Sequence, residues 1–285
     1  MNDLALSGPL APGRLTPFRK YWRIFRVSLT ERMVYRADFL LGTVLRFLPM
    51  VTTILLWHAI FEGSGQEELG GFDLQQMVAY LLLVHISRMF SSMPGLAGGI
   101  ARSVRDGSLK KYLLQPIHMI PYLLAYRVAH KVAYIVTSAL PYALLFYVCR
   151  SYFDLSHLDA WRVVAYLTSL LLSFAIGFFM EACIGMTGFW ILEITSLLYV
   201  VNTLNFFVSG HMFPLDLLPS PWAEILKSLP FQYLAYYPAA VLTGHIPQDQ
   251  LLRGVGLQAA WAALFFILAR LLFKIGLRRY SAFGG

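Results

Sequence analysis

Two carboxylates, Glu181 and Glu193, stand inside stretches of sequence that are otherwise apolar. An ionisable group at membrane depth costs about 2.5–3.5 kcal/mol on insertion scales, so such a group usually has a function or a partner. Either carboxylate could line a pathway through the protein, or form a structural ion pair with Arg127 or Lys131. Glu181 also belongs to a small-residue stripe at four-residue spacing, which on a helix would pack against another helix or line a cavity. The stripe comprises Ser173, Gly177, Glu181 and Gly185.

Two asparagines, Asn202 and Asn205, share one helical face in a neighbouring apolar stretch. Asparagine rarely faces lipid, so these amides either line the same pathway or hydrogen-bond to neighbouring helices. His85 and Arg88 stand midway along another apolar stretch. Together with Glu181 they contain the groups of a proton relay, but their spacing in the sequence does not by itself support one.

The composition identifies the class of protein that carries these groups. The 285 residues are 58% hydrophobic and 13% charged, with a mean hydropathy of +0.61. Soluble domains have about 45–50% apolar and about 25% charged residues, so the sequence predicts an integral membrane protein. The net charge of +8 comes from basic residues that flank apolar segments, which argues against nucleic acid as a partner. No metal-ligand spacing is present, and Cys149 and Cys183 are interpreted as small buried residues.

Windows of about 20 apolar residues predict six transmembrane helices in one all-α domain covering residues 1–285. The predicted spans are Phe39–Phe61, Met77–Leu96, Met119–Val148, Val163–Met186, Phe189–Val208 and Leu251–Phe273. Thr187 and Gly188 alone would join the fourth span to the fifth. Fourteen lysines and arginines lie on one side of this arrangement and four in the opposite loops. The bias predicts that both termini are cytoplasmic.

Three segments are predicted not to span the membrane. Within residues 1–38, an amphipathic helix over 16–36 would lie in the headgroup plane. Residues 98–118 form a basic loop with two short helices, in which Gly107 is the break, Ser108 caps the second helix and Pro116 ends it. Residues 209–248 contain six prolines and two helices of about ten residues, half of what crossing requires, so they predict an extracellular re-entrant hairpin.

Together these parts resemble the membrane (permease) subunit of ABC exporters of the type-two class, which includes drug, lipid and polysaccharide exporters. The loop pattern of that family is an apolar residue, then Gly, Leu and a Leu-x-x-Pro ending. Here these are Val104, Gly107, Leu109, Leu113 and Pro116. The resemblance covers nearly the whole chain.

The resemblance implies an elbow helix over residues 16–36 and a coupling helix in the basic loop that fits a cleft of an ATP-binding subunit. It also implies a pathway between two permease chains, identical or related, in the cell (inner) membrane, with Glu181, Glu193, Asn202 and Asn205 as candidate lining residues. The candidate ATPase-coupling residues are Arg102, Val104, Arg105, Gly107, Leu109, Lys110, Lys111, Leu113 and Pro116.

The expected function is export of an amphipathic or lipid-like substrate or drug, powered by a separate subunit that binds ATP and Mg²⁺. The printed sequence holds no Gly-Lys dipeptide, so it lacks the loop G-x-x-x-x-G-K-[ST] that cradles phosphates. We therefore expect no catalytic site, metal or cofactor on this chain. The alternative is a membrane-embedded lipid-modifying enzyme that uses His85, His211, Glu181 or Glu193, although these residues show no metal spacing such as H-E-x-x-H.

Overall fold

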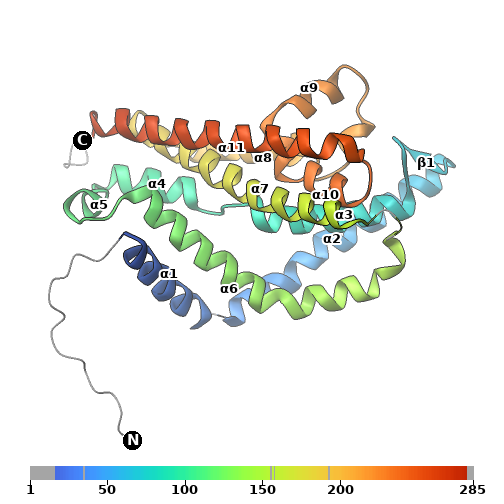
Figure 1. Cartoon of the computed structure of the whole chain (residues 1–285), viewed down its shortest axis with the longest axis horizontal. Coiled ribbons are helices and arrows are strands. Elements are labelled where there is room, and N and C mark those ends of the chain that lie inside the picture. Colours follow the sequence, from blue (N-terminus) through green and yellow to red (C-terminus); the bar gives the residue numbers. More distant parts are fainter. Residues whose placement is uncertain (1–16, 35, 155, 157, 192, 281–285) are drawn as a thin grey trace, which may run out of the picture.

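The computed structural model describes residues 17–34, 36–154, 156, 158–191 and 193–280. The described chain is a bundle of long helices with one antiparallel hairpin, whose two strands have two residues each (Figure 1). The fold is therefore the all-α membrane type that the sequence predicts. Residues 1–16 and 35 of the predicted 1–38 arm lie outside the described residues.

The elements follow one another in simple order. The longer helices are α1 (Pro17–Val34), α2 (Arg36–Ser64), α3 (Leu74–Ser91), α4 (Leu96–Arg105), α6 (Met119–Val148), α7 (Ala160–Met186), α8 (Thr195–Val208) and α11 (Gln248–Leu277). The shorter elements are β1 (Glu68–Leu69), β2 (Phe72–Asp73), α5 (Lys110–Leu114), η1 (Arg150–Tyr152), η2 (Thr187–Phe189), η3 (Leu215–Leu217), α9 (Trp222–Ser228), η4 (Pro230–Leu234) and α10 (Tyr236–Leu242).

Carboxylate caps define where two of the central helices begin. At α3 the Asp73 carboxylate accepts a hydrogen bond from the backbone N–H of Gln76 at 2.7 Å, and the Gln76 side chain accepts one from the Asp73 N–H at 3.3 Å. At α7 the Asp159 carboxylate accepts from the backbone N–H of Arg162 at 2.6 Å. Such caps satisfy N–H groups that have no partner inside the helix.

Within the described residues, five helical segments are long and apolar enough to cross a membrane. They correspond to the first, second, third, fourth and sixth predicted spans. The segments are Phe47–Ser64, Leu74–Arg105, Met119–Val148, Ala160–Phe189 and Gln248–Leu277.

The fifth predicted span, Phe189–Val208, is shorter than the sequence suggests. Helix α8 begins only at Thr195 and has 14 residues, so it is about 21 Å long against a hydrocarbon core of about 30 Å. The Glu193 carboxylate accepts hydrogen bonds from the backbone N–H of Thr195 at 3.0 Å and from its hydroxyl at 2.5 Å. These bonds satisfy donor groups of the first helical residue. The connection from α7 is therefore longer than Thr187 and Gly188.

The second span is broken between α3 and α4, at residues 92–95. Pro94 cannot donate a backbone hydrogen bond and Gly95 has a φ of +73°, so the helix stops and restarts. The Lys131 ammonium, on a side chain only 8% exposed, donates to the carbonyl oxygens of Met89 and of Ser92, the latter at 2.6 Å. These bonds satisfy carbonyl groups at the end of α3.

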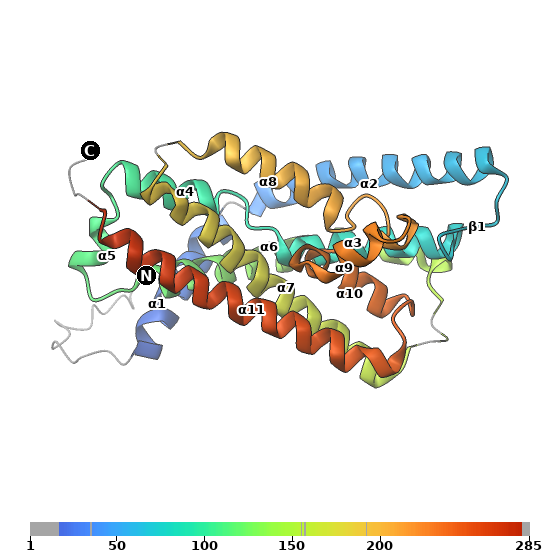
Figure 2. The same cartoon turned by 90° about the horizontal axis from the view of Figure 1, so that it is seen from above.

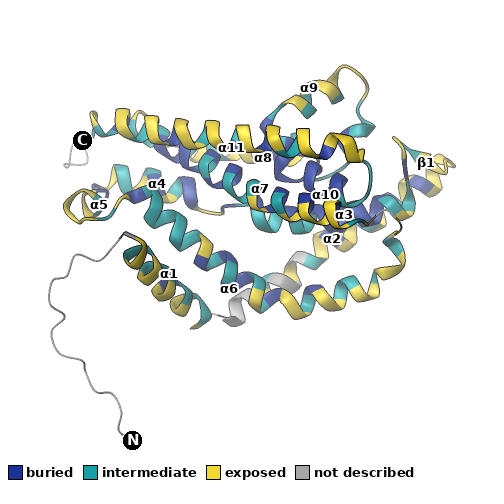
Figure 3. Cartoon of the chain, in the orientation of Figure 1, coloured by how far each residue is buried: buried dark blue, intermediate teal, exposed yellow. Residues whose placement is uncertain are grey.

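Helix α7 is the centre of the bundle and packs against α3, α4, α10 and α11. The two glycines of its small-residue stripe face the broken helix, so packing against a helix is one of the two expected roles that the stripe has. A Cβ atom at Gly177 would overlap the backbone of Ser91, and one at Gly185 would lie 2.8 Å from the backbone of Ala97. Figure 3 shows the buried residues concentrated in α3, α7 and α10, while α1 and α11 expose their outer faces.

The ends of the molecule differ in charge. The basic loop and the C-terminal end of α11 lie together at one end, with α1 nearby, and the β1–β2 hairpin lies at the other (Figure 1). The first end, which we call the basic end, carries Arg102, Lys110, Lys111, Lys274 and Arg278. The hairpin end carries Glu67, Glu68, Asp73, Asp154 and Asp159.

Residues 209–248 form the short elements η3, α9, η4 and α10, and the two predicted short helices correspond to α9 and to η4 with α10. The segment is attached to the bundle by polar contacts. The Tyr80 hydroxyl donates to the carbonyl of Gly210 at 2.5 Å, and the buried Arg162 guanidinium donates to the carbonyls of Val241 and Ile246 at 2.8 and 3.0 Å. These bonds tie the backbone of the segment to α3 and α7.

We expect Gly185→Leu to destabilise the fold, because its side chain would begin within 2.8 Å of the Ala97 backbone. Overpacking of this kind costs about 1–3 kcal/mol. The thermal midpoint of the purified protein in detergent, followed by circular dichroism, should therefore fall. Gly256→Leu is the matched control, since nothing lies within 4 Å of a Cβ at that position in α11. Equal midpoints for the two variants would contradict the close packing of α7 on α4.

Candidate functional site

The basic loop turns sharply between α4 and α5. Gly107 has a φ of +72°, a conformation that favours glycine, so it is the break that the sequence predicts. The predicted cap is wrong, because the residue before α5 is Leu109 and no side chain caps this helix. Ser108 is instead the donor in a turn: its backbone N–H donates to the Asp106 carboxylate at 2.9 Å. An aspartate two residues earlier therefore shapes the loop.

The nine predicted coupling residues divide into a buried and an exposed group. Leu109 is fully buried and Val104 packs against the same core cluster, so these two side chains anchor the loop. Gly107 is buried at the turn. The exposed members are Arg102, Arg105, Lys110, Lys111, Leu113 and Pro116. The exposed group has charge and apolar surface side by side.

Four contacts from distant parts of the chain hold the basic loop. The Tyr280 hydroxyl, just after α11, donates to the Gly107 carbonyl at 2.8 Å. On the other flank, α1 supplies Lys20, which donates to the carbonyl of Pro116, and Tyr21, whose hydroxyl accepts from the His118 N–H at 3.3 Å. The loop is therefore fastened to two other helices.

The fourth contact is an ion pair between Arg105 and Glu193, with Nη1 and Oε2 separated by 2.6 Å. Hydrogen bonds from Thr195, and then from Arg105, lower the pKa of Glu193 to about 2. Hydrogen bonds from Ser108 likewise lower the pKa of Asp106. Both carboxylates are exposed and charged at neutral pH. The pair connects the end of α4 to the start of α8.

A cavity of about 580 Å³ lies beside the break between α3 and α4. Helices α2, α3, α6, α7 and α8 contribute to its wall, together with the start of α4 and the segment after α8. The polar residues in its lining include Thr53, His85, Arg88, Ser91, Ser92, Glu181, Asn202, Asn205 and His211. Most of the remaining lining is apolar and includes Met50, Met89, Met180, Leu198 and Phe206.

Three of the four predicted pathway residues, Glu181, Asn202 and Asn205, line this cavity. Glu193 does not line it and is paired with Arg105 at the basic end. The Glu181 carboxylate faces the backbone N–H of Ala97, in the first turn of α4, and interacts electrostatically with Arg127 and Arg88. Glu181 thus has a structural role at the start of α4 as well as a place in the cavity wall.

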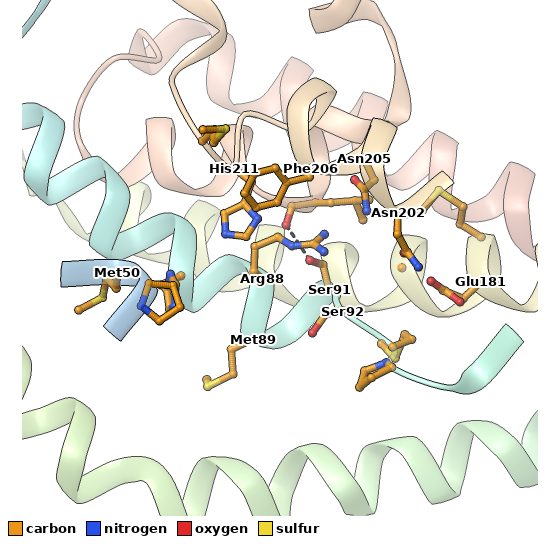
Figure 4. A pocket seen from close by; sticks show the side chains of 18 of the residues that line it. Met50, Arg88, Met89, Ser91, Ser92, Glu181, Asn202, Asn205, Phe206 and His211 are labelled. Carbon is orange, nitrogen blue, oxygen red and sulfur yellow. Dashed lines mark hydrogen bonds between the residues drawn. The ribbon is translucent and has the colours of Figure 1, made fainter. Parts of the chain in front are cut away.

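The cavity also brings together side chains from distant parts of the sequence. The rings of His85 and His211 have centroids 6.1 Å apart, and His211 interacts electrostatically with Arg88. Figure 4 shows His211 beside Arg88. Two buried atoms in this wall have no hydrogen-bond partner in the described chain, Asn205 Oδ1 and His211 Nδ1. An unpaired buried polar atom costs free energy, so these atoms mark a place where a bound molecule could supply a partner.

In the part of the chain that the structure describes, no group of three or more His, Cys, Asp or Glu side chains is arranged to hold a metal ion. His85, His211 and Glu181 share the cavity, but Glu193, the fourth residue of the enzyme hypothesis, is at the basic end.

Sequence reasoning missed two residues at these sites. Leu114 is 82% exposed on α5, the most exposed of the large apolar side chains, although the family pattern directs attention to Leu113. Lys131 was considered as the partner of a carboxylate, whereas it caps the carbonyls at the end of α3. Pro94 is the residue in the sequence that could have indicated the break between α3 and α4.

Comparison with known proteins agrees with this arrangement. The model of the ABC-2 family transporter protein matches residues 47–284, which include the cavity, the basic loop and residues 209–248. No curated protein matches the chain. Since the family model covers most of the sequence, the chain belongs to the ABC-2 family of transporter proteins.

Proposed function

We propose that this chain is the permease subunit of an ATP-driven exporter, powered by a separate ATP-binding subunit. Membership of the ABC-2 transporter family establishes a membrane transport component. The observation that carries the finer proposal is the basic loop, which is structured, exposed and fastened to α1, α8 and α11. A loop that served only to orient the chain in the membrane would need its charges but not these contacts.

The proposed docking surface comprises the exposed side chains of α5 and its flanks, Lys110, Lys111, Leu113, Leu114 and Pro116. Apolar side chains surrounded by charge suit a protein interface, where the apolar centre contributes affinity and the charges contribute orientation. ATP binding would favour one arrangement of the ATP-binding subunits. The basic loop would then shift the permease toward the state that this arrangement binds more tightly.

The proposed membrane placement has six crossings, with the basic end in the cytoplasm of a cell with an inner membrane. Helix α1 is the elbow helix in the headgroup plane, where Phe18 and Trp22 expose stacked rings. Helix α8, continued by residues 209–248 as a re-entrant hairpin, makes the crossing that its 14 residues cannot make alone. The termini then lie on the same side.

A second permease chain, identical or related, is proposed to pack on the edge formed by α2 and α8. Figure 2 shows these two helices along one side of the molecule and α11 along the opposite side. Helix α8 exposes large apolar side chains, including Tyr199, Val200, Leu204 and Phe207. Asn202 and Asn205, on the same helix, line the cavity, so the substrate pathway would lie next to this edge.

An amphipathic or lipid-like molecule or drug is the proposed cargo. The cavity wall combines thioether, aliphatic and aromatic side chains with a few polar groups, which suits a molecule with an apolar body and a small polar part.

Lys110→Glu with Lys111→Glu should remove the ATP-binding subunit from the purified complex. Both side chains are exposed, so the thermal midpoint of the chain should stay unchanged. The two new glutamates would face the acidic surface with which a basic loop pairs, and like charges repel. The measurement is mass spectrometry of proteins that copurify with the tagged chain, together with ATP-driven export in proteoliposomes. Arg278→Glu with Arg279→Glu is the matched control, with the same charge change at the basic end but outside the basic loop.

Copurification that is lost equally in both double variants would show a general charge effect and contradict docking by α5. Activity of the isolated chain on lipid, with no copurifying subunit, would favour the lipid-modifying enzyme instead.

Arg105→Glu should reduce export, and Arg105→Glu with Glu193→Arg should restore it, because the exchange re-forms the ion pair. The thermal midpoint should change little, since exposed pairs contribute about 1 kcal/mol or less. The lowered pKa of Glu193, about 2, means that the pair is present at neutral pH and is lost only as the pH falls through that value. The variant effects should therefore be the same throughout the neutral range. An export defect that the double variant fails to repair would show that the pair itself does not matter.

A further inference from the structure

We propose that the cavity beside the α3–α4 break binds the anionic head group of an amphipathic molecule, with Arg88 as the counter-charge. This inference rests on the proposed function only in treating the bound molecule as cargo. The site itself is argued from the charges and unpaired polar atoms of the cavity wall.

Arg88 supplies the positive charge. It lies in the last turn of α3 and lines the cavity, where Figure 4 shows it among Ser91, Asn205 and His211. No side chain or backbone acceptor in the described chain forms a hydrogen bond with its guanidinium. The guanidinium has five N–H donors in a fixed fork, which matches the oxygens of a phosphate or carboxylate.

The negative charge in the wall does not cancel this preference. Glu181 interacts with Arg88, but it is also shared with Arg127 and with the Ala97 N–H at the positive end of α4. One carboxylate thus faces two guanidinium groups and a helix N-terminus. The imidazoles of His85 and His211, contributed by α3 and by the segment after α8, add no negative charge. The cavity therefore favours an anion near Arg88.

The uncharged polar groups add a second requirement. Asn205 is only 6% exposed, and its Oδ1 atom has no partner in the described chain; His211 Nδ1 has none either. Turning the amide of Asn205 by 180° exchanges the positions of its accepting oxygen and donating nitrogen, and a change of tautomer exchanges the roles of the two ring nitrogens of His211. These groups therefore suit a head group that carries both oxygens and hydroxyls.

The apolar part of the wall indicates what is attached to the head group. Met50, Met180, Leu198 and Phe206 line the same cavity, from α2, α7 and α8. A volume of about 580 Å³ is within the usual range of ligand sites, about 300–1,000 Å³, and exceeds what a free inorganic anion needs. A hydrocarbon chain next to the anion would occupy this space, which favours an amphiphile over free phosphate.

The test is equilibrium binding of radiolabelled dodecyl phosphate to the purified full-length chain in phosphatidylcholine nanodiscs, with binding to empty nanodiscs subtracted. We expect saturable binding that dodecyl maltoside and inorganic phosphate do not displace. Arg88→Gln should raise the Kd about ten-fold or more, because a hydrogen bond to a charged group is lost. Asn205→Leu should raise it by a smaller factor.

Arg270→Gln is the matched control, since Arg270 is also an arginine of a predicted span but stacks on Phe266 outside the cavity. Its Kd should equal that of the unchanged chain. If Arg88→Gln does not fold, as judged by size-exclusion chromatography, Arg88→Lys and Asn205→Leu decide the question, and the lysine variant should keep most of the binding.

Unchanged binding in Arg88→Gln would overturn the inference, as would an equal loss in Arg270→Gln. Where Arg88→Gln does not fold, unchanged binding in Asn205→Leu would overturn it. Displacement by inorganic phosphate at a similar Kd would identify a free-anion site and reject the amphiphile. The assay contains no ATP-binding subunit. Failed binding with intact copurification and export would thus reject this site alone, whereas binding without a copurifying subunit would reject the proposed function alone.

Discussion

The interruption between α3 and α4 is the constraint on which the rest of the structure depends. Backbone N–H and C=O groups at membrane depth have no water to bond, so a broken helix survives only where protein supplies the partners. Lys131 from α6 donates to the carbonyls of Met89 and Ser92, and Glu181 from α7 faces the Ala97 N–H. These two charged side chains bring α6 and α7 to the break. The glycines of the small-residue stripe then allow α7 to approach the broken helix closely.

The same interruption places the cavity and the basic loop at the two ends of one helix, α4. Helix α4 begins beside the cavity wall and ends at Arg105, so its ten residues, about 15 Å of helix, separate the two. The Glu181 carboxylate faces its first turn. The Arg105–Glu193 pair joins its last turn to the residues just before α8. Helix α8 returns to the cavity through Asn202 and Asn205. Two helices, α4 and α8, thus connect the basic loop to the same polar wall.

The outer surface fits a protein that is embedded in a bilayer. Helices α2, α8 and α11 expose large apolar side chains around a core centred on α3 and α7. In a bilayer, lipid covers such faces at no cost, and a second transport chain covers them equally well. Polar contacts are concentrated inside the bundle and at its two ends. Membership of the ABC-2 family agrees with this distribution of surfaces.

The sequence by itself determined the membrane class, the long helices, the small-residue stripe of α7 and the turn at Gly107, because these follow from composition, local periodicity and backbone preference. It also identified Glu181, Asn202 and Asn205, since polar groups are rare in apolar stretches. Only the tertiary structure decided which of these residues meet. The Arg105–Glu193 pair joins residues 88 positions apart, and Lys131 reaches carbonyls about 40 positions away. Helix α8 starts only at Thr195, and the apolar residues before it conceal this late start in the sequence. Contacts between distant segments depend on how the helices pack, and local sequence patterns do not encode that packing.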